Sequence, residues 1–377
     1  MSGSKVHFIW KEPGAPRFGA RFGTGVSLHG HTLHSRECLS FLPRYLRRVP
    51  VVSAVVRRYE KRGPDGRAPV DFSRAYWTPP LTPVTALRVE KEQIEGLGLR
   101  PLVSITDHDD IEAPLALQVT SNRQEVPVSV EWSVPYGASI LHLGIHNLPA
   151  GRDRSWMAAM KAYTAAPDEA RLPELLAALA RMPEVLIVLN HPFWLEEGVV
   201  EENHGRALDR LFRECLPWIH AFELNATRPW WENRASIALA EAHGRPVISG
   251  GDRHACEPGG AINLTRAQCF SEFVTEIRQG SSTLLFMPQY REPLGLRILE
   301  MSWDILRTYP EYPGRERWTD RIFYVGEDDV AKPLSVIWNG QAPWMSTGVT
   351  GILQLLAARR LRGALRLLLT NRGEVLP

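Results

Sequence analysis

Cysteine is scarce in this sequence, and its spacing gives no sign of pairing. The 377 residues include four cysteines, and no two of them form a C-x-x-C pair: Cys38, Cys215, Cys256 and Cys269. Domains that depend on disulfides carry many cysteines in a short chain, whereas thiols in the cytoplasm stay reduced. We therefore expect reduced thiols in a cytoplasmic protein and no disulfide framework.

Long hydrophobic runs and a strong net charge are also missing. No stretch of about 18 uninterrupted apolar residues occurs, so we expect no membrane-spanning helix. Residues 1–5 contain no apolar run, so we expect no secretory signal. The formal net charge is only +2, which argues against a molecule that coats nucleic acid or membrane. The 44% apolar content is typical of a soluble globular protein with one large domain or two ordinary ones.

Positive charge is concentrated in one segment, residues 38–85. Arg44, Arg47 and Arg48 share one helical face by their spacing, and the segment ends in a proline-rich stretch at residues 79–83. We interpret residues 38–85 as an insertion over a site. The alternative is an ordinary solvated basic helix.

Strand-like and helix-like segments alternate from residue 85 onward. The expected strands cover residues 102–106, 126–131, 140–145, 185–189, 221–225 and 246–249. The expected helices cover residues 85–97, 168–181, 234–243 and, near the C-terminus, 351–369. This alternation predicts an α/β protein with a mainly parallel sheet, whose ligands gather at the carboxyl ends of the strands. An edge strand or ordered arm is expected within residues 5–25.

Two histidines, His29 and His31, stand at the end of an expected strand. Alternate residues of a strand point to the same face, so both imidazoles can reach one ion. Zinc and similar metals accept imidazole and carboxylate ligands together. Alone, the pair is weak evidence, because such a pair is more often an ordinary polar strand end. Other expected strands also end in or near His, Asp or Glu, however, so the sequence predicts a multinuclear metal centre.

Six motifs, in order along the chain, resemble those of the PHP family, named for polymerase and histidinol phosphatase. They are His29–Thr32, Thr106–Asp109, Glu131, Leu141–Gly144, Asn190–Pro192 and Gly250–His254. The resemblance implies an α/β fold of the PHP type, a distorted (β/α)7 barrel over residues 1–288, with the basic insertion at about 38–85. Residues 289–377 would form a C-terminal extension that packs on the barrel. The resemblance also implies two or three divalent ions, usually zinc, manganese or iron.

The resemblance assigns ligands to each ion by position in the motifs. They are His29, His31, Glu131 and Asp252 for the first ion, His108 and His254 for the second, and His142 and His191 for the third, with Glu131 bridging. One position departs from the family pattern, because Arg36 stands where relatives usually have Asp. Glu37, the next residue, is therefore predicted to complete the second ion's ligands, and His34 is the alternative.

Arg253 and Asp107 are the candidate catalytic residues. Arg253 stands where a small residue is more common in the family, and a fixed cation there suits a phosphate oxygen. Asp107, like Asn190, lies next to a predicted ligand and is expected to orient it. A metal-bound water that loses its proton near neutral pH would be the nucleophile, so no serine or cysteine nucleophile is needed. The sequence identifies no general acid.

These observations predict a metal-dependent phosphoesterase that acts on a small phosphomonoester or a nucleotide. One alternative is a nuclease of the same chemistry, in which the basic insertion follows the backbone of a short nucleic acid. The other is a non-catalytic scaffold stabilised by metal, which is disfavoured because nearly all ligand positions are filled. We favour the small substrate because no row of aromatic residues accompanies the basic segment. The leucine- and arginine-rich helix at residues 351–369 is expected to pack on the barrel, with a membrane-surface or oligomer contact as the alternative. Substrate, metal and oligomeric state are not specified.

Overall fold

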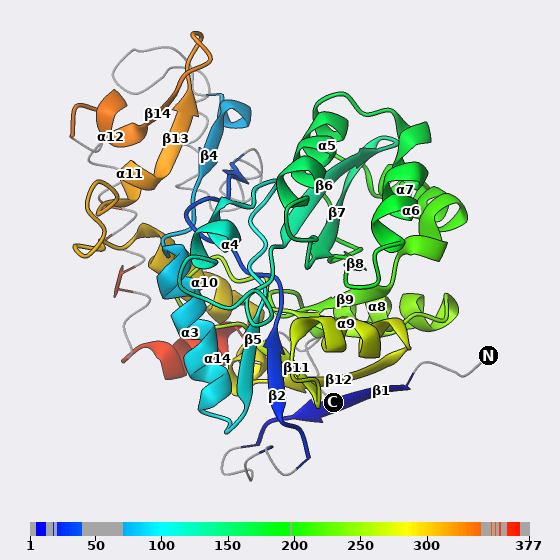
Figure 1. Cartoon of the computed structure of the whole chain (residues 1–377). Helices are drawn as coiled ribbons and strands as arrows, with labels where there is room; N and C mark the ends of the chain where they lie inside the picture. The colour runs from blue at the N-terminus through cyan, green and yellow to red at the C-terminus, as the bar shows by residue number, and fades with distance from the viewer. Residues whose placement is uncertain are drawn as a thin grey trace.

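The computed structural model describes residues 5–12, 18, 21–39, 71–196, 198–340, 348, 351, 354–355 and 360–369. In this part of the chain, two five-stranded sheets and one four-stranded sheet are combined with helices, which confirms the α/β class. Figure 1 shows the four-stranded sheet set apart from the two larger ones. None of the described helices is both long and apolar enough to cross a membrane.

The first sheet contains the N-terminal strands. Its order is β1 (Lys5–Trp10), β12 (Ser281–Phe286), β11 (Ala261–Thr265), β2 (Thr24–Ser27) and β5 (Arg100–Val103). β1 pairs with β12 in parallel, and β2 pairs with β5 in parallel, whereas β11 is antiparallel to both of its neighbours. The edge strand expected within residues 5–25 is therefore confirmed as β1.

The second sheet is mixed as well. Its order is β10 (Val247–Gly250), β9 (Ala221–Asn225), β8 (Leu186–Leu189), β7 (Ser139–His146) and β6 (Val130–Tyr136). β8, β9 and β10 are parallel, but β7 is antiparallel to both β6 and β8. Gly137, with φ 59°, and Ala138 join β6 to β7, and so short a turn forces an antiparallel pair. The expectation of a mainly parallel sheet is therefore wrong, and the strand expected at 126–131 begins at Val130 instead.

Two isolated bridges link the larger sheets where their strands end. Gly30, beyond β2, bridges to Arg253, beyond β10, and His108, beyond β5, bridges to Glu131 in β6. The C-terminal ends of β2, β5 and β10 and the start of β6 therefore lie around the same region. Continuous strand pairing among the described residues is confined to separate sheets, so a closed (β/α)7 barrel is not established and stays a prediction.

Helices connect the strands and cover the sheets. They are α3 (Pro83–Glu95), α4 (Glu112–Leu117), α5 (Asp153–Ala165), α6 (Leu172–Ala180), α7 (Glu201–Cys215), α8 (Trp230–Ala242) and α9 (Phe270–Arg278). α3 begins where the Thr82 side chain accepts the Thr85 N–H, with Pro83 in the first turn. α8 begins before the predicted residue 234 because Pro229 ends the preceding extended segment, and it stops before Gly244, which has φ 61°.

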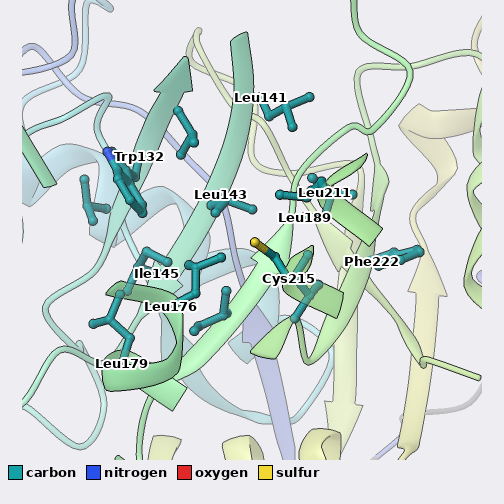
Figure 2. Packing of buried hydrophobic residues seen from close by; sticks show 14 of the residues in the cluster. Trp132, Leu141, Leu143, Ile145, Leu176, Leu179, Leu189, Leu211, Cys215 and Phe222 are labelled. Atoms are coloured by element: carbon teal, nitrogen blue, oxygen red, sulfur yellow. The ribbon is translucent and has the colours of Figure 1, made fainter. Parts of the chain in front are cut away.

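The largest apolar core lies between the second sheet and its helices (Figure 2). Leu143 and Ile145 of β7 face Leu176 and Leu179 of α6, and Trp132 of β6 packs edge-on against Tyr163 of α5. Each of these leucines is fully buried, and burying such a side chain stabilises the fold by about 1.5–3 kcal/mol. This core holds the β6–β9 strands rigidly, and so it fixes the loops that follow them.

The third sheet joins the insertion to the C-terminal extension. Its order is β14 (Ala331–Pro333), β13 (Ile322–Val325), β4 (Ala75–Trp77) and β3 (Glu37–Cys38). The extension also contains α10 (Leu294–Leu306), α11 (Trp318–Arg321), α12 (Leu334–Ile337) and α14 (Arg362–Leu369). The basic helix predicted around Arg44 lies outside the described residues, and the domain boundary at 288 stays a prediction.

α14 covers only part of the helix predicted at residues 351–369. Arg362 pairs with Glu300 and Arg366 with Glu292, so α14 lies along α10 and its preceding loop. Leu367 and Leu368 are exposed.

Candidate metal centre

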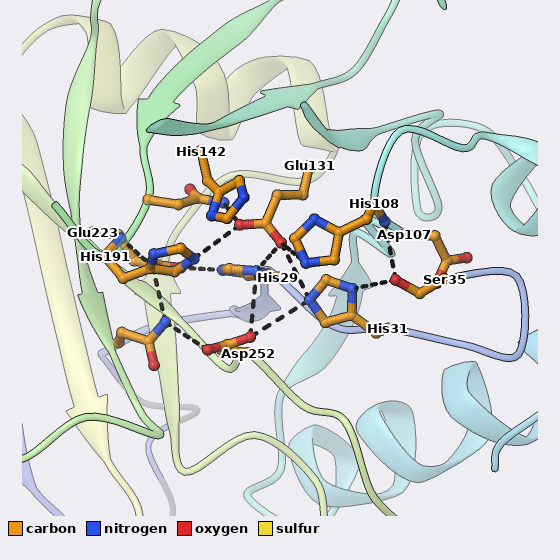
Figure 3. A network of polar contacts seen from close by, with 12 residues as sticks. His29, His31, Ser35, Asp107, His108, Glu131, His142, His191, Glu223 and Asp252 are labelled. Carbon is orange, nitrogen blue, oxygen red and sulfur yellow. Dashed lines mark hydrogen bonds and ion pairs between the residues drawn. The ribbon is translucent and has the colours of Figure 1, made fainter. Parts of the chain in front are cut away.

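The predicted metal ligands converge in one region (Figure 3). Most of them follow the last residue of a strand, but Glu131 lies at the start of β6 and His142 lies within β7. Three of them, His29, His191 and Asp252, have positive φ angles of 60°, 24° and 46°. Residues other than glycine rarely adopt this backbone conformation, which is strained for them. The strain persists only where surrounding contacts hold the backbone in place. Backbone hydrogen bonds hold the loops that carry His29 and Asp252 in this conformation. Gly251 N–H donates to the Leu28 carbonyl, and His31 N–H donates to the Arg253 carbonyl.

The first cluster joins the His-x-His pair to acidic groups. His29, His31 and Asp252 form one group that could hold an ion. His29 Nε2 lies 2.8 Å from Glu131 Oε2 and 3.5 Å from Asp252 Oδ1. His31 Nε2 lies 3.3 Å from the same Glu131 oxygen and is buried without a hydrogen-bond partner among the described residues. Buried polar atoms usually have a hydrogen-bond partner. A buried ring nitrogen that is surrounded by carboxylates and makes no hydrogen bond is therefore suited to bind a metal ion.

The second cluster contains His31, Glu37, His108 and His254. Glu37 Oε2 lies 3.2 Å from His254 Nε2 and 3.6 Å from His108 Nε2. The structure therefore brings Glu37 into this cluster, as predicted from its place after Arg36. His34, the alternative, belongs to none of the ligand groups found among the described residues.

The third cluster contains Glu131, His142 and His191. His191 Nε2 lies 3.0 Å from Glu131 Oε1, while Glu131 Oε2 faces His29, His31 and His108. One buried carboxylate thus contacts imidazoles from all three clusters, which is the bridging position expected for Glu131.

Glu223 is a site residue that the sequence analysis missed. Its Oε1 lies 2.5 Å from His29 Nδ1, and its Oε2 accepts the backbone N–H of His191 and the Asn225 side chain. A Cβ at Gly250 would lie 1.6 Å from Glu223 Oε1, so only glycine leaves room for this carboxylate. The available signal was an ionisable residue inside a five-residue strand, Ala221–Asn225, that is otherwise suited to full burial.

The two residues expected to orient ligands act on different parts of the site. Asn190 Nδ2 donates to Glu131 Oε1 at 3.0 Å, so it fixes the bridging carboxylate. Asp107 accepts both the backbone N–H and the hydroxyl of Thr32, at 2.5 and 2.7 Å, so it fixes the loop after His31. A direct catalytic role for Asp107 stays a prediction.

Arg253 is buried beneath the ligands. Its guanidinium donates to Glu90 Oε1, to the Ala255 carbonyl and to the His31 carbonyl, each at 3.0 Å. These bonds tie the loop after β10 to the loop after β2. The guanidinium thus donates to groups of the protein itself. The phosphate-binding role predicted for Arg253 stays a prediction.

A second arginine, Arg228, lies beside the clusters and was not singled out from the sequence. Its guanidinium stacks on the Trp194 ring at 3.9 Å from the centroid, and Nη2 lies 3.8 Å from Asp252 Oδ2. Its Nε is buried and makes no hydrogen bond among the described residues, although Glu232 Oε1 lies 3.9 Å from it. Arg228 therefore offers a fixed donor to an anion at the edge of the centre.

Electrostatic coupling sets the charges of the carboxylates. Burial raises the pKa of Glu131, but attraction to His29 and His108 outweighs it and holds that pKa well below its ordinary value. Burial acts on Asp252 and Glu37 in the same way, and neighbouring imidazoles again lower both pKa values. These carboxylates are therefore ionised at neutral pH, as metal ligands must be.

The histidines fall into two kinds. Burial lowers the pKa of His29 and His31, but the surrounding carboxylates raise the first well above its ordinary value and the second to about 10. Burial lowers the pKa of His142 well below its ordinary value, aided by the neighbouring His108. A bound cation would replace the protons on His29 and His31, so metal binding should release protons. The donors, all imidazole and carboxylate, fit zinc, manganese or iron.

Comparisons with known proteins give structural likenesses only. No family model matches the chain, and no curated protein matches it. PsfC from Pseudomonas syringae is similar at a TM-score of 0.41 and 16% identity, over 73% of this chain and 95% of that one. A protein from Bifidobacterium adolescentis, provisionally assigned as a metal-dependent phosphoesterase, is similar at 0.34 and 15%, over 54% and 92%. An amidohydrolase from Chromobacterium violaceum, solved with sulfate and without metal, is similar at 0.32 and 15%, over 47% and 83%. At these scores the three likenesses carry no argument about function. The clustered ligands of the chain itself are the evidence for a metal centre.

Proposed function

We propose that this protein is a metal-dependent hydrolase, and more specifically a phosphoesterase acting on a small phosphate ester. The observation that carries the proposal is the position of Glu131. Its two oxygens lie 2.8–3.3 Å from the ring nitrogens of His29, His31, His108 and His191, and Glu131 itself is fully buried. A carboxylate shared in this way suits neighbouring cations held a few ångströms apart.

Two or three divalent ions would occupy the clusters. The first position would use His29, His31 and Asp252, the second Glu37, His108 and His254, and the third His142 and His191, with Glu131 between them. When bound, such ions would activate water as a nucleophile and neutralise the charge that develops on phosphoryl oxygens.

The residues of the chain itself support an anionic substrate. Arg228 has a buried Nε that makes no hydrogen bond among the described residues, with Glu232 Oε1 3.9 Å away, and its stacking on Trp194 fixes the guanidinium plane. A phosphate oxygen placed between Arg228 and the clusters would satisfy this donor in a charge-assisted hydrogen bond. Asn190, Asn225 and Thr227 keep Glu131 and Asp252 oriented, through contacts of 2.9–3.0 Å.

Metal analysis combined with a substrate panel tests the proposal. The purified protein should carry two or three equivalents of transition metal and should hydrolyse phosphomonoesters. Asp252→Asn should lower both metal content and activity, because it removes a ligand. His7→Ala, which changes an exposed histidine on β1, should lower neither. A metal-free protein that binds no added zinc, manganese or iron would overturn the proposal.

The panel should include a labelled oligonucleotide because a nuclease would share the same chemistry. Cleavage of the oligonucleotide without turnover of any phosphomonoester would replace the small-substrate assignment with the nuclease. A scaffold would bind metal and hydrolyse neither.

A further inference from the structure

The second ligand cluster differs from the others in exposure. The side chains of His108, His254 and Glu37 are 17%, 16% and 11% exposed, whereas those of His29, His31 and Glu131 are at most 1% exposed. The second position is therefore the one least enclosed by the two larger sheets. What encloses it instead is the third sheet.

Glu37 is held by this third sheet. It belongs to β3, which has two residues and, among the strands that the structure describes, pairs with β4 alone, where Glu37 lies opposite Trp77. Trp77 in turn lies opposite Ile322 of β13, in the C-terminal extension. Residues directly opposite on paired strands share a face, so Glu37 and Trp77 face the centre together. The Trp77 ring lies 5.9 Å from the His254 ring, in agreement with that orientation.

Arg315 connects the extension to the loop that carries His31 and Glu37. Its Nη1 donates to the Leu33 carbonyl at 3.2 Å and to the Thr78 hydroxyl at 3.3 Å. Arg315 is partly buried and pairs with no carboxylate among the residues whose contacts are described. Thr78 N–H also donates to the Arg321 carbonyl at 2.9 Å. A guanidinium taken out of water costs free energy unless it is hydrogen-bonded, so the bonds to Leu33 and Thr78 hold Arg315 in this position.

The extension also holds the loop that carries Asp252 and His254. Cys256 N–H donates to Asp304 Oδ2 at 3.2 Å, and the Cys256 thiol lies 2.9 Å from the Tyr309 hydroxyl. Asp304 is in α10, and Tyr309 follows it. One segment, residues 304–322, therefore contacts two of the three loops that supply ligands to the second cluster, and the third is the loop after β5 that carries His108.

We propose that residues 304–322 form a clamp that positions Glu37 and His254 and thereby sets the affinity of the second metal position. The proposal rests on the metal centre of the proposed function. Arg315 acts in it as a positioning residue, through Leu33 and Thr78, and touches no ligand itself. Glu37 and His254 come from distant parts of the sequence. Through the clamp, the positions of both depend on the C-terminal extension.

The test measures metal binding by the full chain rather than activity. Chelator-treated protein is dialysed against graded free Mn²⁺, and bound manganese is counted per chain. In Arg315→Met, one equivalent should require about 10- to 100-fold more free Mn²⁺, as for other residues that orient ligands. The remaining equivalents should bind as in wild type. Arg317→Met, which removes an exposed arginine of the same segment, should change none of them.

A double-mutant cycle shows whether the clamp acts through Glu37. Glu37→Gln should weaken the same equivalent, and adding Arg315→Met to it should have little further effect, because the ligand being positioned is already lost. Thr78→Val removes the hydroxyl that accepts from Arg315 and donates to the Arg321 carbonyl at 3.4 Å, but it keeps the backbone N–H bond. It should give a smaller shift of the same equivalent, and it replaces Arg315→Met if that variant does not fold.

Several outcomes would overturn the clamp. They are wild-type binding in Arg315→Met, an equal loss of every equivalent in a folded variant, and full additivity with Glu37→Gln. If wild type itself binds no manganese, zinc or iron, the proposed function fails first, and that failure is visible before any variant is compared.

Discussion

Replacing Glu223 by glutamine is expected to weaken metal binding although Glu223 need not touch the ion. Its Oε2 accepts from His191 N–H and from Asn225, and its Oε1 faces His29 Nδ1 at 2.5 Å. If the amide oxygen of glutamine keeps the two Oε2 bonds, its NH₂ group must face His29 Nδ1. His29 then has to accept there, so its proton moves to Nε2, the nitrogen that faces Glu131 and Asp252. A protonated Nε2 cannot bind a metal ion.

The size of the effect follows from the bonds that change. Turning the amide around to save the His29 contact would instead set NH₂ against two donors, His191 N–H and Asn225 Nδ2. A hydrogen bond to a charged group contributes about 1.5–3 kcal/mol, and loss of a residue that orients a ligand costs about 10- to 100-fold in metal affinity. We therefore expect Glu223→Gln to raise the dissociation constant of the first-position ion by that factor.

Equilibrium dialysis against Zn²⁺ or Mn²⁺, with bound metal counted per chain, measures this shift. Glu214→Gln is the matched control, because Glu214 also accepts side-chain hydrogen bonds but lies on α7 beside Tyr136 and Arg210. Unchanged metal affinity in Glu223→Gln would refute the tautomer argument.

Two further predictions concern pH and the substrate. The raised pKa values of His29 and His31 stabilise the metal-free fold below the unfolded-state histidine pKa of about 6.5. This contribution is lost as pH rises toward the folded-state pKa of His31, about 10. The melting temperature of chelator-treated protein should therefore fall between about pH 6.5 and 9. The stabilisation by added metal should grow over the same range, because fewer protons compete with the ion. A His31→Asn protein with the same slope as wild type would contradict this origin of the pH dependence. Arg228→Met should raise KM for a phosphomonoester by about 10- to 100-fold and should leave metal content intact. This factor corresponds to about 1.5–3 kcal/mol for one charged hydrogen bond. Equal kcat/KM in variant and wild type would show that Arg228 does not bind the substrate.

The strands that the sequence predicted best are the three buried parallel strands of the second sheet. The strand expected at 221–225 matches β9, and those expected at 185–189 and 246–249 match β8 and β10 within a residue. Their ends carry the histidines and acids, so local pattern also located most of the clustered ligands. Pairing direction was not visible in the same way, because β6 and β7 look like any other strands until the short turn at Gly137 is taken into account.

Contacts between distant segments account for what the sequence did not show. β4 and β13 pair across about two-thirds of the chain, and neither has a local feature that identifies its partner. Glu223 and Arg228 carry no motif of their own, and their roles follow from the positions of His29 and Trp194 in space. Side-chain orientation likewise separated Glu37 from His34, which are three residues apart.

The left-handed backbone at His29, His191 and Asp252 has an evolutionary consequence. Glycine and asparagine adopt this conformation more easily than histidine or aspartate, and a strained residue costs about 1–3 kcal/mol. These positions keep unfavourable residues only while their side chains are needed. A descendant that no longer uses the metal centre should therefore drift to glycine or asparagine at these three positions early, gaining thermal stability as it loses chemistry. Such substitutions would mark inactive members among future relatives of this chain.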